Sequence, residues 1–174
     1  MQYDVKSSHL NSTGFCVKGR NRLKAFAATG ASTAGSINFW DVLVAPTAFA
    51  TSYGQSAFTV TVTSASHGLV TGNSIGIVFG PVSGVSATNG TYVVTVTNAN
   101  VFTITDINSR TIVGGAGSFS AAGGRFMMSY DTAAIVTSGA PQTTSTLIPG
   151  EGILAENGIY AQMTNHLSLT IFYG

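Results

Sequence analysis

Charged residues are scarce in this sequence of 174 residues, because lysine, arginine, aspartate and glutamate together make up only 7% of it. Soluble domains usually contain about 25% of such residues. The hydrophobic fraction is nevertheless 44%, whereas disordered chains combine low hydrophobicity with high net charge. We therefore expect a folded chain whose polar surface is mostly uncharged. Since such a surface limits the solubility of a free monomer, it is a first hint of assembly with neighbouring subunits.

Cysteine and long apolar runs are also missing. Cys16 is the only cysteine, which excludes an internal disulfide framework and a multi-cysteine metal site. No apolar run approaches the roughly 20 residues that a membrane-spanning helix needs. The opening segment MQYDVKSSHLNS lacks the apolar centre of a signal peptide. We expect a protein that is made in the cytoplasm and does not enter a membrane, and the net charge of +1 indicates no particular partner.

The dominant pattern is the alternation of a β-strand, because β-branched residues alternate with threonine and small residues between turns rich in glycine and asparagine. In the segment 58–63, Phe58, Val60 and Val62 should face one side of a strand and three threonines the other. No stretch of ten residues shows a helical period. Asn98-Ala-Asn100 has the length of a hairpin turn, so the strands on either side of it should pair antiparallel.

The spacing of these runs predicts an all-β fold with a sandwich or a barrel. We expect residues 1–52 and 121–174 to form one discontinuous β-sandwich, the docking domain, and residues 53–120 to form a small β-barrel inserted in one of its loops. Low-complexity segments mark the seams at 27–35 and 118–124. The expected strands are 14–28, 36–44, 57–63, 74–79, 91–97, 101–106, 117–120, 125–130, 133–137, 144–148, 158–164 and 168–173.

The middle of the chain resembles a known repeat. Residues 65–74 (ASHGLVTGNS) followed by residues 89–104 (NGTYVVTVTNANVFTI) are similar to a small β-barrel repeat that is named after the first catalytic cysteine half-domain of ubiquitin-activating enzymes. This repeat occurs in tail, fibre and other virion proteins of phages. The resemblance implies a small barrel and a virion setting. It does not imply ubiquitin chemistry, because the middle of the chain contains no cysteine.

The flanking segments are similar to small structural proteins of podovirus-type phages. The matching stretches are DVKSSHLN (4–11), GRNRLK (19–24), LIPGEGIL (147–154), NGIY (157–160) and IFYG (171–174). Those phage proteins are compact and lack the middle insert. The resemblance therefore implies that the middle module is an insertion, and it leaves a head or a tail location open.

Histidines and carboxylates are too scattered to predict a catalytic or metal site. His9, His67 and His166 show no ligand-pair spacing. A metal bound by histidines across a trimer axis is an alternative that this spacing does not require. Ser74 lies in a G-x-S-x-G string, but a strand rather than a helix is expected after it. We expect no enzymatic activity and no cofactor. A glycosidase needs two carboxylates that face each other across a cleft, and the scattered carboxylates of this sequence do not indicate such a pair. They are Asp4, Asp41, Asp106, Asp131, Glu151 and Glu156.

One charged feature stands out, since four of the seven basic residues lie close together. At alternating positions of one strand they would share a face, opposite Val17, Leu23 and Ala25. Such a face either protects a solvated strand edge or contacts an acidic partner surface. Contact with nucleic acid is a weaker interpretation, because no aromatic residue lies among them and the rest of the chain is not basic. The candidate partner-binding residues are Lys18, Arg20, Arg22 and Lys24.

Together these features favour a virion protein. The first hypothesis is a capsid decoration or cement protein that binds the major capsid protein, as a trimer or another homo-oligomer. The second is a tail, collar or fibre-adaptor component whose partners are tail proteins of the same particle. The third is a carbohydrate- or receptor-binding β module, which would need an exposed aromatic platform such as Phe39, Trp40 and Tyr53; a buried strand position explains Trp40 more simply.

Overall fold

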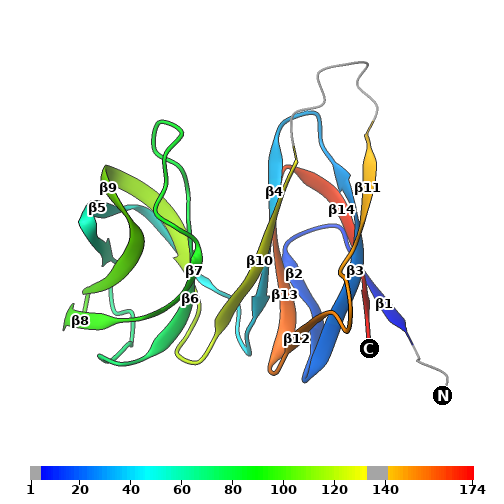
Figure 1. The fold of residues 1–174 in the computed structure, drawn as a ribbon, viewed down its shortest axis with the longest axis horizontal. Coiled ribbons are helices and arrows are strands. Elements are labelled where there is room, and N and C mark those ends of the chain that lie inside the picture. Colours follow the sequence, from blue (N-terminus) through cyan, green and yellow to red (C-terminus); the bar gives the residue numbers. More distant parts are fainter. Residues whose placement is uncertain (1–4, 133–140) are drawn as a thin grey trace. The chain divides into compact units, whose positions relative to one another are not determined.

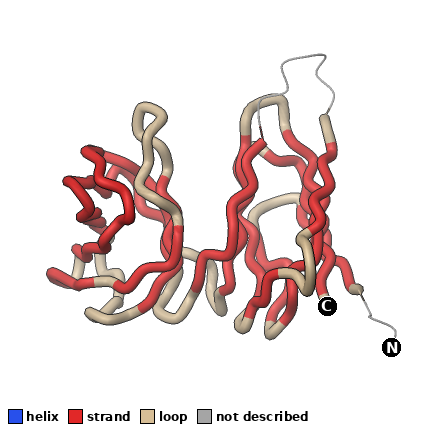
Figure 2. Tube along the Cα trace, viewed as in Figure 1, coloured by secondary structure: helices blue, strands red, loops and turns tan. Residues whose placement is uncertain are grey.

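The computed structural model describes residues 5–132 and 141–174, and in these ranges the chain forms strands, turns and loops but no helix (Figures 1 and 2). The predicted all-β class is thus confirmed. Accordingly, no helix in the described part of the chain is long and apolar enough to span a membrane. The strands are β1 (Lys6–Leu10), β2 (Gly14–Lys18), β3 (Asn21–Gly30), β4 (Gly35–Asp41), β5 (Thr47–Thr63), β6 (Ser74–Phe79), β7 (Gly90–Val93), β8 (Thr95–Asn98), β9 (Val101–Phe119), β10 (Arg125–Thr132), β11 (Thr143–Leu147), β12 (Ile153–Ala155), β13 (Gly158–Thr164) and β14 (His166–Tyr173).

The chain divides into two compact units. The first unit is Met1–Ala45 with Met127–Gly174, and the second unit is Pro46–Phe126. Each unit has its own hydrophobic core, and the two cores share no residue. The second unit is longer than the predicted module 53–120, because β5 already begins at Thr47 and pairs there with the end of β9.

The first unit is a β-sandwich, as predicted. One sheet has the order β1-β14-β3-β11, with β12 also paired to β3, and the other has the order β10-β4-β13-β2; we refer to them as the β3 sheet and the β4 sheet. Both sheets contribute to one core, in which each buried aliphatic or aromatic side chain contributes about 1.5–3 kcal/mol. Its largest members are Leu23, Phe26, Ile37, Phe39, Ile159 and Leu169.

The second unit is a single curved sheet with the order β5-β9-β6-β7, in which β8 also pairs with β9. The predicted small barrel is not closed: in the described pairings β5, β7 and β8 each pair with a single other strand. The interruption lies at Val94, between β7 and β8. Its backbone bonds to Gly72 and Asn73 in the preceding turn instead of continuing a strand, so β7 pairs with β6 while β8 pairs with β9.

The predicted alternation of β5 fails at one position. Val60 and Val62 are buried as expected, but Phe58 is 50% exposed. The register with β9 shifts between Ala57 and Thr59, and Ala57 has a positive φ of 53°. A bulge of this kind turns the residues beside it toward the other face of the sheet.

Most other strands lie where they are predicted, but the predicted strand 91–97 is divided into β7 and β8, and the predicted strands 101–106 and 117–120 are parts of one strand, β9. The hairpin across residues 98–100 is confirmed as an antiparallel β8–β9 pair. The predicted strand 133–137 lies outside the described residues. Two short strands, β1 and β12, were not predicted, because neither KSSHL nor ILA shows an alternation long enough to recognise.

Candidate functional site

The four basic residues do not share one strand face, so this part of the prediction is wrong. Lys18 ends β2 in the β4 sheet, whereas Arg22 and Lys24 lie on β3 in the other sheet. A turn separates them, in which Gly19 has a φ of 80° that a residue with a β-carbon rarely adopts. The side-chain amide of Asn21 closes this turn by donating to the carbonyls of Lys18 and Gly19, at 3.3 and 3.1 Å.

Two of the four basic residues pair with carboxylates. Arg20 Nε lies 3.0 Å from Glu156 Oε2, and Arg22 Nε lies 3.9 Å from Glu151 Oε2. All four side chains are at least 36% exposed, so each pair contributes at most about 1 kcal/mol and is screened by salt. We call Lys18, Arg20, Arg22, Lys24, Glu151 and Glu156 the basic end; it carries two more positive than negative charges.

A buried carboxylate shapes this basic end. Asp41, at the end of β4, is 2% exposed. It accepts hydrogen bonds from the backbone N–H groups of Glu156, Asn157 and Gly158, at 2.9, 2.7 and 3.3 Å. Hydrogen bonds to an ionised acceptor are among the stronger ones in proteins. They fix the β12–β13 turn, and thereby hold Glu156 beside Arg20.

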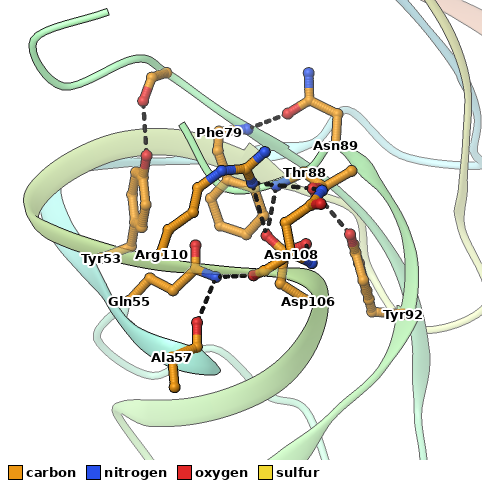
Figure 3. A network of polar contacts seen from close by, with 11 residues as sticks. Tyr53, Gln55, Ala57, Phe79, Thr88, Asn89, Tyr92, Asp106, Asn108 and Arg110 are labelled. Carbon is orange, nitrogen blue, oxygen red and sulfur yellow. Dashed lines mark hydrogen bonds and ion pairs between the residues drawn. The ribbon is translucent and has the colours of Figure 1, made fainter. Parts of the chain in front are cut away.

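The second unit contains a polar network around Asp106 (Figure 3). This side chain of β9 is 2% exposed and accepts from the backbone N–H groups of Thr88 and Asn108, at 2.8 and 3.0 Å. Arg110 Nη1 lies 3.3 Å from the carboxylate and also donates to the Thr88 hydroxyl at 3.1 Å. Burial alone would raise the pKa of Asp106, but the hydrogen bonds and the Arg110 charge outweigh it and lower this pKa from its ordinary value.

Tyr92 of β7 and Gln55 of β5 extend this network (Figure 3). The Tyr92 hydroxyl donates to the carbonyl of Thr88 at 2.7 Å, and burial together with the nearby Asp106 charge raises its pKa to about 12. The Gln55 amide donates to two carbonyls, those of Ala57 and Asn108, at 2.9 and 2.6 Å. These hydrogen bonds are all made within the second unit, so the network stabilises that unit.

The residues that carry the resemblance of the middle module also act in turns. His67 Nε2 donates to the carbonyl of Asn98 at 3.0 Å, while its Nδ1 accepts from the N–H of Leu69 at 3.0 Å. The histidine therefore links the turn before β6 to the β8–β9 hairpin. Three further side chains accept hydrogen bonds from backbone N–H groups. Thr71 accepts from the N–H of Val96, Asn73 accepts from the N–H of Val70, and Asn89 accepts from the N–H of Phe79.

The candidate catalytic and metal-binding residues are not brought together. His9 and His166 make hydrogen bonds within the first unit, and no group of three metal-ligating side chains is found in the ranges 5–132 and 141–174. Ser74 begins β6 and is followed by a strand rather than by the helix of a nucleophile elbow. Cys16 is buried, and burial raises the pKa of its thiol to about 12.

The proposed aromatic platform is not exposed, since Phe39 and Trp40 are fully buried and Tyr53 is only 2% exposed. The surface instead combines few charges with large apolar side chains, among them Leu43, Val70, Ile107, Val113 and Leu147, each more than 60% exposed. Isolated apolar residues are common on protein surfaces, but here they lie on a surface with very few charges. Neither the protein-family models nor the curated proteins include a match to this chain.

Proposed function

We propose that this protein is a structural component of a phage virion, a capsid decoration or cement protein that binds the outer shell. The observation that carries the proposal is the described surface, which exposes large apolar side chains and few charges. Such a surface suits a subunit that neighbouring subunits partly cover in an assembly. The resemblance of the middle module and of the flanking segments to phage proteins supports the same setting.

The mechanism of such a protein is thermodynamic rather than catalytic. Because it binds the assembled shell and not the free shell subunits, it stabilises the assembled state by mass action, by about 2.7 kcal/mol when its free concentration is a hundred times Kd. The partner is then the major capsid protein. A trimer or another symmetric homo-oligomer would place several weak contacts on the shell at once and strengthen attachment without any new kind of contact.

A tail, collar or fibre-adaptor component is the second candidate. It is favoured by one observation, namely that the repeat resembled by residues 65–74 and 89–104 occurs in tail and fibre proteins. The core of the second unit, which includes Val60, Ile75 and Phe102, is separate from the core of the first. The second unit would then act as a spacer or as a tip that faces the host.

Counting the copies of this chain in purified particles tests both candidates. Quantitative mass spectrometry against the major shell protein should give about one chain per shell subunit, or one trimer for a few subunits, if the protein decorates the shell. About a dozen copies or fewer per particle would place it in the tail. If the chain is absent from particles, both candidates are wrong.

A further inference from the structure

We propose that the outer face of the β3 sheet is the surface through which this protein docks. Its partner would present a flat, uncharged protein surface with acidic groups along one border. This inference rests on the proposed function, to which it adds the docking face and the chemistry of the partner. Four observations lead to this proposal. The side chains of the face lie in rows across neighbouring strands, the rows carry few charges, the face lies next to the basic end, and its area is small.

The outward side chains of three neighbouring strands lie in straight rows. Phe172 of β14 and Leu147 of β11 both lie opposite Ala25 of β3. In the next row, Thr170 and Ser145 both lie opposite Ala27. The intervening residues of β3 and β14 point inward, as the burial of Phe26, Ala28, Leu169 and Ile171 shows.

The two rows contain no lysine, arginine, aspartate or glutamate, and most of their side chains are small. On β1 the rows continue with Ser7 opposite Phe172 and with His9 opposite Thr170, and His9 Nδ1 lies 2.8 Å from the Thr170 hydroxyl. Leu147 is 78% exposed and Phe172 is 38% exposed, so two of the largest members of the face are apolar and accessible. An uncharged face loses little when water is removed from it, whereas a buried unpaired charge is expensive. Alanine, serine and threonine also keep the face flat enough for another flat surface to approach closely.

The basic end adjoins this face. Lys24 directly precedes Ala25 on β3, and Arg22 lies two residues before Lys24 on the same strand. The Glu151 carboxylate that pairs with Arg22 is 3.9 Å away, and its side chain is 85% exposed. A partner with acidic groups at the matching border would complement the surplus of positive charge. Charges at the rim of an interface mainly set its register and its association rate, so the uncharged centre and the charged border have separate roles.

The size of the face argues against a second copy of this chain as its partner. Strands about 4.8 Å apart with a rise of about 3.4 Å per residue give four strands of five residues an area on the order of 300 Å². A stable interface buries about 800 Å² on each side. One such face is therefore too small for a stable dimer, whereas a homo-oligomer that presents several such faces to the shell attaches firmly through several weak contacts at once.

The test places one arginine at the centre of the face. Ala27→Arg and Ser145→Arg are each compared with Thr61→Arg, which adds the same charge at an exposed position of β5 in the second unit. The probe is the particle of the phage that encodes this chain, purified without the chain and then mixed with each variant. We expect at least about tenfold weaker binding for the two face variants and wild-type binding for Thr61→Arg. Lys24→Glu should slow association at low salt, and this difference should shrink near 1 M salt, where the Debye length is about 3 Å.

The outcomes separate the docking face from the proposed function. If wild-type chain neither occurs in nor binds to the particles, the proposed function fails and the docking face fails with it. If wild type binds and both arginine variants bind equally well, the docking face is wrong while the function stands. If sedimentation shows a wild-type oligomer that Ala27→Arg dissociates, the face belongs to a second copy and the proposed partner is wrong. Protection of the Cys16 thiol from labelling verifies that each variant is folded.

Discussion

Asp41 Oδ1 accepts a hydrogen bond from the backbone N–H of Asn157 at 2.7 Å, although 116 residues separate the two in the sequence. The contact joins the end of β4 to the turn between β12 and β13. The same turn presents Glu156 to Arg20. The conformation of the basic end therefore depends on a carboxylate that is itself buried in the first unit.

Replacing Asp41 with alanine should destabilise the protein by about 2–4 kcal/mol, because three backbone N–H groups would lose a charged acceptor in a buried turn. Urea unfolding at neutral pH measures this difference in the free energy of unfolding. Asp131→Ala is the matched control, since Asp131 is an exposed carboxylate on β10 and should change stability by less than about 0.5 kcal/mol. Equal effects of the two substitutions would contradict the role assigned to Asp41.

The sequence was a good guide where side chains alternate without interruption. The segment 158–164 and the segment 74–79 form strands with the predicted bounds, because apolar residues alternate or run together there between clear turn residues. The sandwich also follows from patterns of this kind. Phe58 shows where prediction from alternation fails. It alternates clearly with Val60 and Val62 in the sequence, but the bulge at Ala57 depends on a register shift against β9, which only the assembled sheet defines.

The candidate site was predicted less well for a related reason. Lys18 and Arg22 alternate in the sequence, yet the turn at Gly19 places them in different sheets. A glycine followed two residues later by an asparagine was the available signal for this turn. By contrast, no local sequence pattern predicts the hydrogen bonds between Asp41 and residues 156–158, because they join segments that are far apart in the chain.

Lowering the pH should weaken the second unit through Asp106. The pKa of Asp106 is lowered from its ordinary value of 3.8 in the folded protein. Its contribution to stability is therefore fully present above about pH 3.8 and is lost as the pH falls through the folded-state pKa. Asp106→Asn should be less stable than wild type by about 1–3 kcal/mol at pH 7, and this gap should narrow below pH 4. Unfolding curves of both proteins from pH 2.5 to pH 7 test this, and a gap that is independent of pH would refute it.

Cys16 should report on the folding of the first unit. Its thiol is buried and its pKa is raised from 9.0 to about 12, so it stays protonated near neutral pH and is a poor nucleophile. A thiol-specific reagent at pH 8 should label the native protein far more slowly than the protein unfolded in urea. The same shift implies that the contribution of Cys16 to stability is complete below pH 9 and declines as the pH rises toward 12. Rapid labelling of the native protein at pH 8 would show that the thiol is accessible.

Removal of residues 46–126 should leave the first unit folded. The chain leaves this unit after β4 and returns at β10, and these strands are neighbours in one sheet. The hydroxyl of Ser129 donates to the side chain of Asn38 at 2.8 Å, and that of Thr132 donates to the carbonyl of Gly35 at 3.3 Å. Residue numbers rise along β10 as they fall along β4, so the two strands run antiparallel and the cut ends lie close together.

A short glycine-containing turn between Ala45 and Met127 can therefore close the gap, as hairpin loops of two to five residues commonly do. The shortened protein should unfold cooperatively in urea and protect Cys16 as well as the full chain does, since its core includes no residue from 46–126. Residues 46–126 alone, expressed as a control, should also unfold cooperatively, because their core is likewise their own. Unprotected Cys16 in the shortened protein would mean that the first unit needs the second in order to fold. In that case the second unit would be part of the folding core of the protein rather than a separable insertion.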